Sequence, residues 1–168
     1  MVIPLVIRQT SLADAPAVTA LLRELGYPAE PDRVASTLRR LLDDTSAFVF
    51  VGVEETYSVV GLLSLSCRPV LRLQGVAGTI EELAVLADAR SRGVGGRLLQ
   101  YAKGLASERG WVRLEMGVTQ LREVNRSDFF DSRGFSRADS LTYRWSRLEG
   151  CHPVLPAIAR ARHRHEFV

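Results

Sequence analysis

At 168 residues the chain has the length of one domain with its own hydrophobic core, and a content of 46% hydrophobic and 24% charged residues is ordinary for a globular protein. No apolar run approaches the roughly 20 residues of a membrane-spanning helix. Residues 1–60 carry five arginines against eight acids, whereas residues 61–168 carry 17 basic residues against 11 acids. Because no run of four or more basic residues interleaved with aromatic residues occurs, we expect no nucleic-acid partner. Because no apolar run is long enough to span a membrane, we expect no membrane partner.

The cellular setting is expected to be reducing. Cys67 and Cys151 lie far apart in the sequence and make no disulfide framework. The first residues lack the basic region and cleavage pattern of a signal peptide. We therefore expect a cytoplasmic protein.

Hydrophobic periodicity predicts alternating strands and helices. A first strand is expected at 5–9, and a helix follows over 10–25 with Ser11 as its N-cap. Pro31 suits the first turn of a second amphipathic helix over 31–44. The remaining expected elements are strands at 46–55, 58–70, 79–86, 111–118 and 135–145, and helices at 93–108 and 125–132. This order predicts an α/β fold with one mixed central sheet flanked by helices, in a single domain over 1–147 with a tail at 148–168.

A cluster of glycines opens the helix expected over 93–108. A helix N-terminus exposes free N–H groups and partial positive charge, and glycine lets an anion come close to them. The simpler alternative is a tight strand-to-helix turn that needs glycine. No lysine follows the glycines as a P-loop requires, and Leu98 interrupts a dinucleotide-binding fingerprint. The residues of the candidate phosphate loop are Arg90, Ser91, Arg92, Gly93, Val94, Gly95, Gly96 and Arg97.

This loop and its surroundings resemble the GNAT superfamily of acyl-CoA-dependent N-acetyltransferases. Residues 90–95, RSRGVG, match the family's Gln/Arg-x-x-Gly-x-Gly/Ala motif. Upstream, 80-IEELAV-85 resembles Ile-x-x-Leu-x-Val, and downstream 129-FFDSRGF-135 resembles Phe-Tyr-Glu-x-x-Gly-Phe. The resemblance covers about residues 5–147. It implies a GNAT-like fold with a partly splayed central sheet, in which acetyl-CoA lies between the parallel strands 79–86 and 111–118.

The resemblance also implies which residues hold acetyl-CoA. The N–H groups of residues 92–97 would bind the pyrophosphate, and the backbone of Leu83, Ala84 and Val85 would bind the pantetheine arm and polarise the thioester carbonyl. Asn125 resembles an asparagine with which many members contact the coenzyme, although it could equally cap the following helix. No metal is expected, since the three histidines have no acid or cysteine at ligand spacing.

An amine acceptor is protonated near pH 7, so acyl transfer needs a base. Glu81 and Glu82 lie on the strand in question. Neighbouring residues of a strand point to opposite faces, so we expect only one of them to face the substrate, and the resemblance favours Glu81. Glu115 is a third option. Phe130 stands where the family usually has a tyrosine that protonates the leaving thiolate. Three possibilities stay open: another donor such as Ser127 protonates the thiolate, water does so, or the domain binds coenzyme A without much turnover.

Two functions from different classes follow. The first is an enzyme that transfers an acetyl group from acetyl-CoA to a primary amine of a small molecule or a protein. Its acceptor should lie between the first two helices and the last strands, in an acidic half that mildly suits a cation. The acids concerned are Asp32, Asp43, Asp44, Glu54 and Glu55. The alternative, prompted by Phe130, is an acyl-CoA-binding sensor or interaction module. Phosphate or nucleic-acid binding without acyl chemistry is a third reading, and homodimerisation stays open.

Overall fold

The computed structural model describes residues 4–54, 58–118 and 127–138, which all belong to one compact unit spanning Met1–Ala138. The boundary expected after residue 147 and the tail lie outside the described residues. No helix in the described part of the chain is long and apolar enough to cross a membrane.

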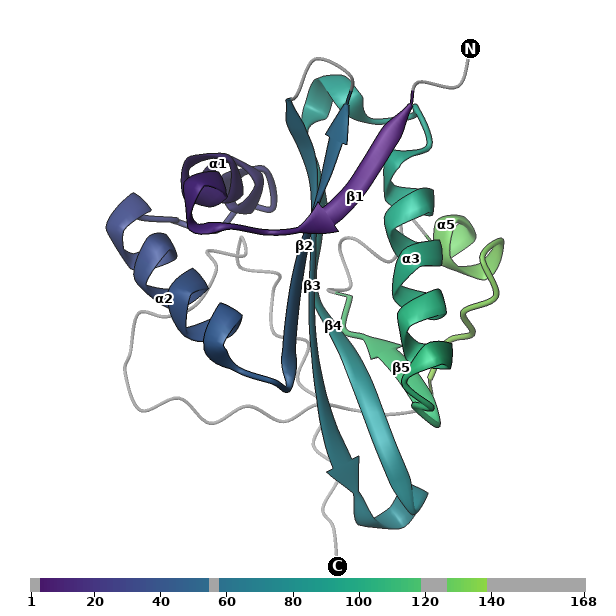
Figure 1. Ribbon diagram of the computed structural model, residues 1–168. Coiled ribbons are helices and arrows are strands. Elements are labelled where there is room, and N and C mark those ends of the chain that lie inside the picture. Colours follow the sequence, from purple (N-terminus) through teal and green to yellow (C-terminus); the bar gives the residue numbers. More distant parts are fainter. Residues whose placement is uncertain (1–3, 55–57, 119–126, 139–168) are drawn as a thin grey trace, which may run out of the picture. The chain divides into compact units, whose positions relative to one another are not determined.

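One five-stranded sheet organises the fold (Figure 1). Its strands are neighbours in chain order, the first four antiparallel and the last two parallel. This arrangement confirms the predicted mixed sheet. The strands are β1 (Leu5–Gln9), β2 (Ala47–Glu54), β3 (Val59–Val70), β4 (Gly75–Val85) and β5 (Arg113–Met116).

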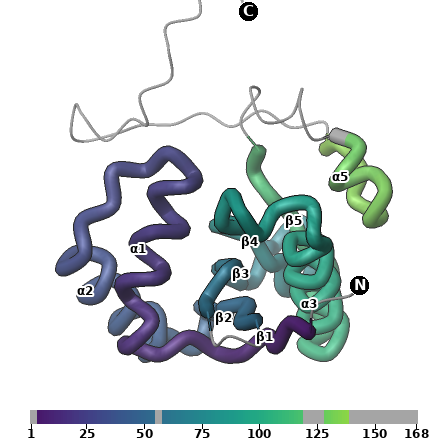
Figure 2. Tube along the Cα trace, turned by 90° about the horizontal axis from the view of Figure 1, so that it is seen from above, coloured from purple at the N-terminus to yellow at the C-terminus, as the bar shows by residue number. Residues whose placement is uncertain are grey.

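Helices cover both faces of the sheet, as the view in Figure 2 shows. On one face lie α1 (Ala15–Glu24) and α2 (Pro31–Asp43), and on the other lie α3 (Val94–Glu108) and the short α5 (Ser127–Asp131). All four helices were predicted. Short 3-10 turns at Leu12–Asp14, Leu71–Leu73 and Ala87–Ala89 join the elements.

Two hydrophobic clusters fix the helices to the sheet. Leu63 and Leu65 of β3 are buried against Leu98 and Leu99 of α3. Leu62, the residue before Leu63, points to the other face and packs with α1 and α2. The alternation of side chains along β3 therefore supplies both cores from a strand that is buried on its two faces.

The start of β4 differs from the prediction. The sequence suggested a loose glycine-containing segment over 74–78, but β4 begins at Gly75 and pairs with β3 along its whole length. The glycines make room for the segment before β5, because a Cβ on Gly78 would overlap the ring of Trp111 and one on Gly75 would lie 2.6 Å from a methyl group of Val112. These glycines are therefore packing residues within a strand, although a glycine-containing segment is more typical of a loop.

The last expected strand is not found in the described residues. Residues 135–138 follow Gly134 without regular structure, and residues 139–145 lie outside the described part. Gly134, with φ +77°, ends α5 as predicted.

The N-terminal turn of the α1 region is held by an ion pair. Both guanidinium Nη atoms of Arg8 donate to the Asp14 carboxylate at 2.8 and 2.7 Å, and the backbone N–H of Ser11 donates to it at 2.7 Å. The hydrogen bonds from Arg8 lower the pKa of Asp14 to about 2, and those from Ser11 act in the same direction. Asp14 is buried, whereas Arg8 is partly exposed.

We expect Asp14→Asn to lower the free energy of unfolding at pH 7 by about 1–3 kcal/mol, because the charge-assisted bonds are lost while a capping oxygen remains. Since the folded-state pKa lies below the unfolded value, this contribution is complete above about pH 4 and is lost as the pH falls through about 2. Urea denaturation at several pH values measures it. The exposed Asp43→Asn is the matched control, and an equal effect of both substitutions would contradict the assignment.

Candidate active site

The parallel strands β4 and β5 separate midway along β4. Their pairing runs from Ala77 with Arg113 to Ile80 with Met116, and there β5 ends while β4 continues to Val85. Among the described residues, the edge of β4 over 81–85 has no strand partner on the β5 side. The sheet is therefore open along this edge.

Backbone alternation decides which groups line that opening. The N–H of Leu86 donates to the carbonyl of Val60 in β3 at 3.0 Å, so the backbone groups of Ala84, two residues earlier, also point to β3. Those of Leu83 and Val85 point to the open side. In agreement, the Val85 carbonyl accepts a hydrogen bond from Arg90 Nε at 3.2 Å. Of the three residues predicted to hold the pantetheine arm, Leu83 and Val85 offer backbone groups to the opening and Ala84 does not.

The N-terminus of α3 lies at the end of the same strand. Gly93 is its N-cap, with φ +83° and no side chain that could cap the free N–H groups. The N–H of Arg97 bonds the Gly93 carbonyl, so the N–H groups of residues 94–96 precede the first intrahelical bond. Ser91 also has positive φ, +61°, a conformation that costs about 1–3 kcal/mol in a non-glycine residue and recurs at ligand sites. The loop thus presents N–H groups suited to an anion.

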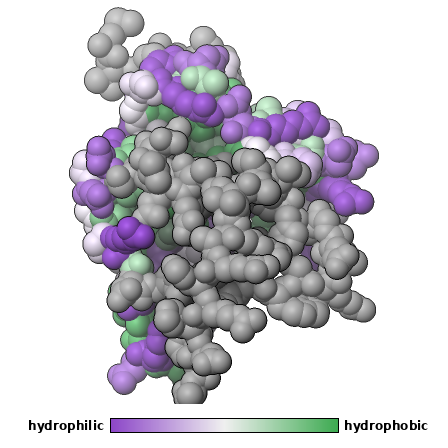
Figure 3. Space-filling model, turned by 180° about the vertical axis from the view of Figure 1, so that it is seen from behind, coloured by the Kyte–Doolittle hydropathy of each residue, from purple (hydrophilic) through white to green (hydrophobic). Residues whose placement is uncertain are grey.

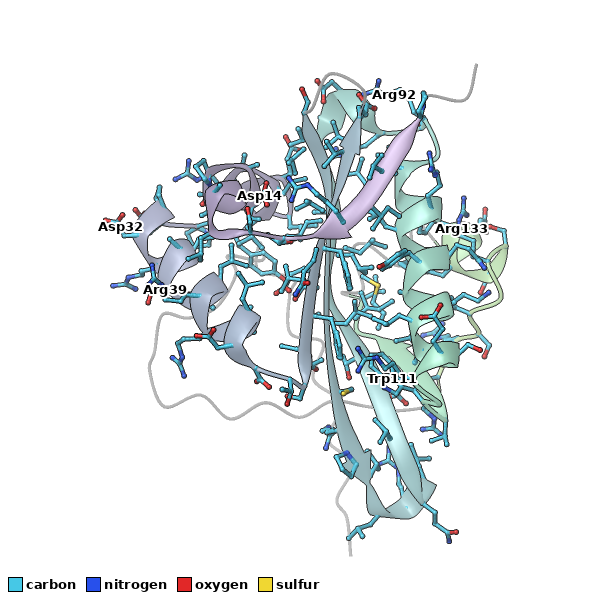
Figure 4. All side chains as sticks on the ribbon, in the orientation of Figure 1. Asp14, Asp32, Arg39, Arg92, Trp111 and Arg133 are labelled. Atoms are coloured by element: carbon cyan, nitrogen blue, oxygen red, sulfur yellow. The ribbon has the colours of Figure 1, made fainter. Side chains whose placement is uncertain are left out.

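The arginines of this loop are engaged with other parts of the protein. Arg90 pairs with Glu24 at the end of α1 (2.6 Å), and Arg92 pairs with Glu54 at the end of β2 (3.2 Å; Figure 4 labels Arg92). Arg97 donates to a backbone carbonyl of β1 at 2.6 Å. These contacts fix the loop to the sheet and to α1, so the backbone, more than the arginine side chains, is available to a phosphate.

Arg133 was not singled out from the sequence. Its guanidinium stacks on the Phe129 ring at 4.0 Å and donates to the Phe129 carbonyl at 2.8 Å. A Cβ on Gly96 would lie only 2.9 Å from Arg133 Nε, so this cation reaches the first turn of α3 because residue 96 is glycine. Phe130 packs edge-on against Phe129, with ring centroids 5.1 Å apart, and belongs to the core on this face. A close approach between distant residues leaves no periodic signal in a sequence.

The two glutamates of β4 lie on one face of the sheet, contrary to the expectation of opposite faces. The register between β3 and β4 shifts here, with Glu81 as the extra residue of a β-bulge. Ser66 Oγ donates to Glu81 Oε1 at 2.5 Å, and Glu82 bonds with Ser64. Because Ser64 and Ser66 are two residues apart in a regular strand, their side chains share a face, which is the face of α1 and α2.

The two carboxylates differ in environment. Glu81 is exposed, whereas Glu82 is partly buried and lines a cavity. Burial raises the pKa of Glu82 above its usual value, its hydrogen bond with Ser64 acts in the opposite direction, and the neighbouring Glu81 carboxylate raises it further. Glu115, the third option, is exposed and pairs with Arg113 at 3.0 Å.

This cavity lies between α1, α2, the loop that joins them and the sheet. The two helices and their loop were expected to surround the acceptor, but the described strands that line the cavity are β2, β3 and β4 instead of the expected last strands. The cavity volume is about 330 Å³. Among the described residues that line it, the acids are Glu30 and Glu82. The acids named from the sequence lie elsewhere: Asp32, Asp43 and Asp44 are exposed and Glu54 pairs with Arg92, while residue 55 is outside the described part. None of the four described acids of this group is among the residues that line the cavity.

Two further site predictions concern residues at the edge of the described part and stay predictions. Asn125 lies outside the described residues, and Ser127 opens α5. In the ranges that the structure describes, no group of three or more His, Cys, Asp or Glu residues could hold a metal ion.

Comparison with known proteins agrees with this architecture. The model of the acetyltransferase (GNAT) family matches residues 15–135. A transcriptional regulator from Bacillus halodurans C-125 superposes with a TM-score of 0.76 at 21% identity, covering 84% of this chain and 100% of that chain. Glucosamine-6-phosphate N-acetyltransferase from Arabidopsis thaliana superposes with a TM-score of 0.73 at 18% sequence identity, covering 84% of this chain and 98% of that chain. Aminoglycoside N-acetyltransferase AAC(6')-Iy in complex with CoA superposes with a TM-score of 0.74 at 16% sequence identity, covering 87% of this chain and 97% of that chain.

At these identities the solved structures establish the fold, which is that of acetyltransferases using acetyl-CoA. A search of the curated proteins finds no significant match. The family assignment rests on the family model, which spans most of the sequence. The chain belongs to the acetyltransferase (GNAT) family.

Proposed function

We propose that this protein is a cytoplasmic N-acetyltransferase that moves an acetyl group from acetyl-CoA to a primary amine, with Glu82 as the general base. One observation carries the proposal. Within four residues, β4 offers a partly buried carboxylate to the cavity through Glu82 and backbone groups to the open sheet edge through Leu83 and Val85. The acceptor and the thioester would thus meet at one strand.

The coenzyme fits the residues that are present. The N–H groups at the start of α3 suit the pyrophosphate, and the open edge of β4 suits the amide groups of the pantetheine arm. When bound, acetyl-CoA supplies the activated acetyl group as a thioester. Arg133, over the first turn of α3, adds positive charge beside the phosphate loop.

In the proposed reaction, the amine first gives a proton to Glu82, directly or through water. Its nitrogen lone pair then forms a bond to the thioester carbonyl carbon, and the carbon–sulfur bond breaks. Backbone N–H groups at Leu83 or Val85 would stabilise the negative charge that develops on the carbonyl oxygen. The nitrogen then still carries one proton more than the amide product, and this proton leaves to water. Phe130 has no proton to donate, so the departing thiolate would take a proton from water, which balances the two transfers.

The alternative is a domain that binds acyl-CoA without turnover. Phe130 favours it, because its ring is packed among Phe129 and Phe135 and no hydroxyl stands in the tyrosine position. One structural neighbour carries the name of a transcriptional regulator. This alternative predicts coenzyme binding and no acetylated product.

Calorimetric titration with acetyl-CoA tests the proposal. We expect saturable binding of acetyl-CoA and of free CoA, and none of ATP or NADH, because only the first two carry the pantetheine arm for which the β4 edge is open. A panel of amines with thiol release as the readout then tests transfer. Binding without release for any amine would favour the sensor, and binding of ATP in place of acetyl-CoA would refute the cleft.

A further inference from the structure

We infer that the acceptor is a small primary amine carried on an apolar chain or ring, without a carboxylate beside the amine and without a second cationic group. This inference rests on the proposed function, because it specifies the acceptor of the same site. It is argued from the lining of the cavity between α1, α2 and the sheet.

The walls of the cavity are apolar. Of the 15 described residues that line it, six have a charged or hydrogen-bonding side chain, namely Tyr27, Glu30, Arg33, Thr37, Ser64 and Glu82. The other nine are valine, leucine, alanine and proline. The aliphatic ones come from every wall: Val18 and Leu22 from α1, Val34, Leu38 and Leu41 from α2, and Val49 and Leu62 from the sheet.

The polar groups come from two sides of the cavity. Ser64 and Glu82 belong to the sheet, whereas Tyr27 and Glu30 lie in the loop before α2, and Arg33 and Thr37 lie on the first two turns of α2, all four exposed. An ammonium group therefore finds its carboxylate at the sheet, and the rest of the molecule meets hydrocarbon. On the α2 side the charges of Glu30 and Arg33 offset each other, so a second ammonium group finds no net negative charge there. The hydroxyl groups of a sugar held along the apolar walls would find no partner among the described aliphatic residues, each at a cost of about 1–3 kcal/mol or more.

The charges of α2 do not alter this lining. Asp32 and Arg39 project away from the sheet (Figure 4), and both are exposed. Seen from behind, the upper right of the surface, on the side where Figure 1 places α1 and α2, is mostly hydrophilic (Figure 3). The polar face of the helix is turned outward and its apolar face is turned to the cavity.

The sheet end of the cavity also disfavours amino acids. Glu81 and Glu82 share a face, and the Glu81 carboxylate is close enough to raise the pKa of Glu82. A substrate carboxylate one carbon from the amine would be a third negative charge at this place. An amine without a carboxylate brings only a positive charge, which it loses when the base removes a proton from the ammonium group.

The size of the cavity limits the acceptor. A volume of about 330 Å³ equals roughly 11 water molecules at about 30 Å³ each. This is the lower end of the range for small-molecule sites, so a ligand of about ten non-hydrogen atoms would fill it. Phenethylamine has this size and chemistry.

Initial rates with acetyl-CoA should be compared for phenethylamine, phenylalanine, ethanolamine, glucosamine and spermidine. We expect kcat/KM for phenethylamine to exceed that for each of the others by about tenfold to a hundredfold, the effect of burying one apolar group. Phenylalanine tests the effect of an added carboxylate, and ethanolamine tests the effect of a hydroxyl group in place of the ring.

A pair of variants on α2 locates the effect. Val34→Asn, in the cavity wall, should lower kcat/KM for phenethylamine about tenfold and leave the affinity for acetyl-CoA unchanged. Arg39→Gln, on the outer face of the same helix, should leave both unchanged. Circular dichroism checks that each variant is folded. If Val34→Asn does not fold, the comparison of the five amines on the wild-type protein still tests the inference.

The outcomes separate the inference from the proposed function. Preferential acetylation of glucosamine, spermidine or phenylalanine would overturn the inference and leave the acetyltransferase assignment intact. Calorimetric binding of phenethylamine to the CoA complex without any transfer would support the apolar cavity and overturn the proposed activity. If phenethylamine neither binds nor is acetylated, and no other amine is acetylated, both the inference and the proposed activity are wrong.

Discussion

Glu82→Gln should lower kcat/KM for amine acetylation by about 10²–10⁴-fold, the usual contribution of a positioned general base. The amide keeps the size and hydrogen-bonding capacity of the side chain toward Ser64, so the cavity should keep its shape. The affinity for acetyl-CoA should not change, because the β4 edge and the α3 N-terminus are untouched. Steady-state kinetics together with calorimetry measure both quantities.

Glu81→Gln is the matched control on the neighbouring residue. Its carboxylate is exposed and bonds Ser66, so the loss of rate should be much smaller than for Glu82→Gln. A larger loss for Glu81→Gln would return the catalytic role to the residue that the sequence favoured. Equal, small losses for both variants would remove the general base from the proposal.

The pH profile of the same proteins adds a second readout. Wild-type kcat/KM should rise with pH through the pKa of Glu82, which burial places above the usual value of about 4.3 for glutamic acid. In Glu81→Gln this limb should move to lower pH, because a neighbouring negative charge is gone. In Glu82→Gln it should disappear.

Stability should change in the opposite direction to activity. Since the folded-state pKa of Glu82 is raised, its burial disfavours the ionised form, and the free energy of unfolding falls as the pH rises through that pKa. Glu82→Gln removes this penalty, so its Tm at pH 7 should exceed that of the wild type. Below about pH 4, where the carboxyl is protonated in both states, the difference should vanish.

Gly78→Val should destabilise the protein by about 3 kcal/mol, at the upper end of the effect of overpacking. A side chain on Gly78 would occupy the position of the Trp111 ring, which packs against Phe48 with centroids 5.7 Å apart. The ring cannot move outward without opening the core between β4 and α3. Urea denaturation measures the loss.

Gly104→Ala is the control for this substitution. Gly104 lies inside α3, and a Cβ there would meet nothing within 4 Å. Alanine should therefore stabilise the protein by up to about 1 kcal/mol through helix propensity. If Gly78→Val were as stable as the wild type, Trp111 would have to lie elsewhere.

Local signals allowed most elements to be predicted. Leu5–Gln9 became a strand with the predicted bounds, and Pro31 opened α2 as its fixed φ suggests. The glycines before α3 identified both the helix start and the family. Each of these features depends on residues close together in the sequence.

The features that the sequence did not reveal depend on pairing between distant segments. Glu81 became a bulge only through its register with β3, so its face could not be derived from alternation alone. Gly75 and Gly78 appeared to be loop residues because their packing partners lie more than 30 residues away. The ion pair of Arg90 with Glu24 joins positions 66 residues apart.

The extra residue in β4 reverses the alternation of side chains between the two faces of the sheet for the rest of the strand. Upstream of Glu81 the strand alternates in one phase and downstream in the other, so that Leu83 returns to the α3 face and Glu82 reaches the cavity. Removing one residue at this point would put every later side chain of the strand on the wrong face, whereas exchanging Glu81 for another residue would not. The number of residues in this strand therefore fixes the fold here, so we expect deletion of residue 81 to destabilise the protein far more than its replacement.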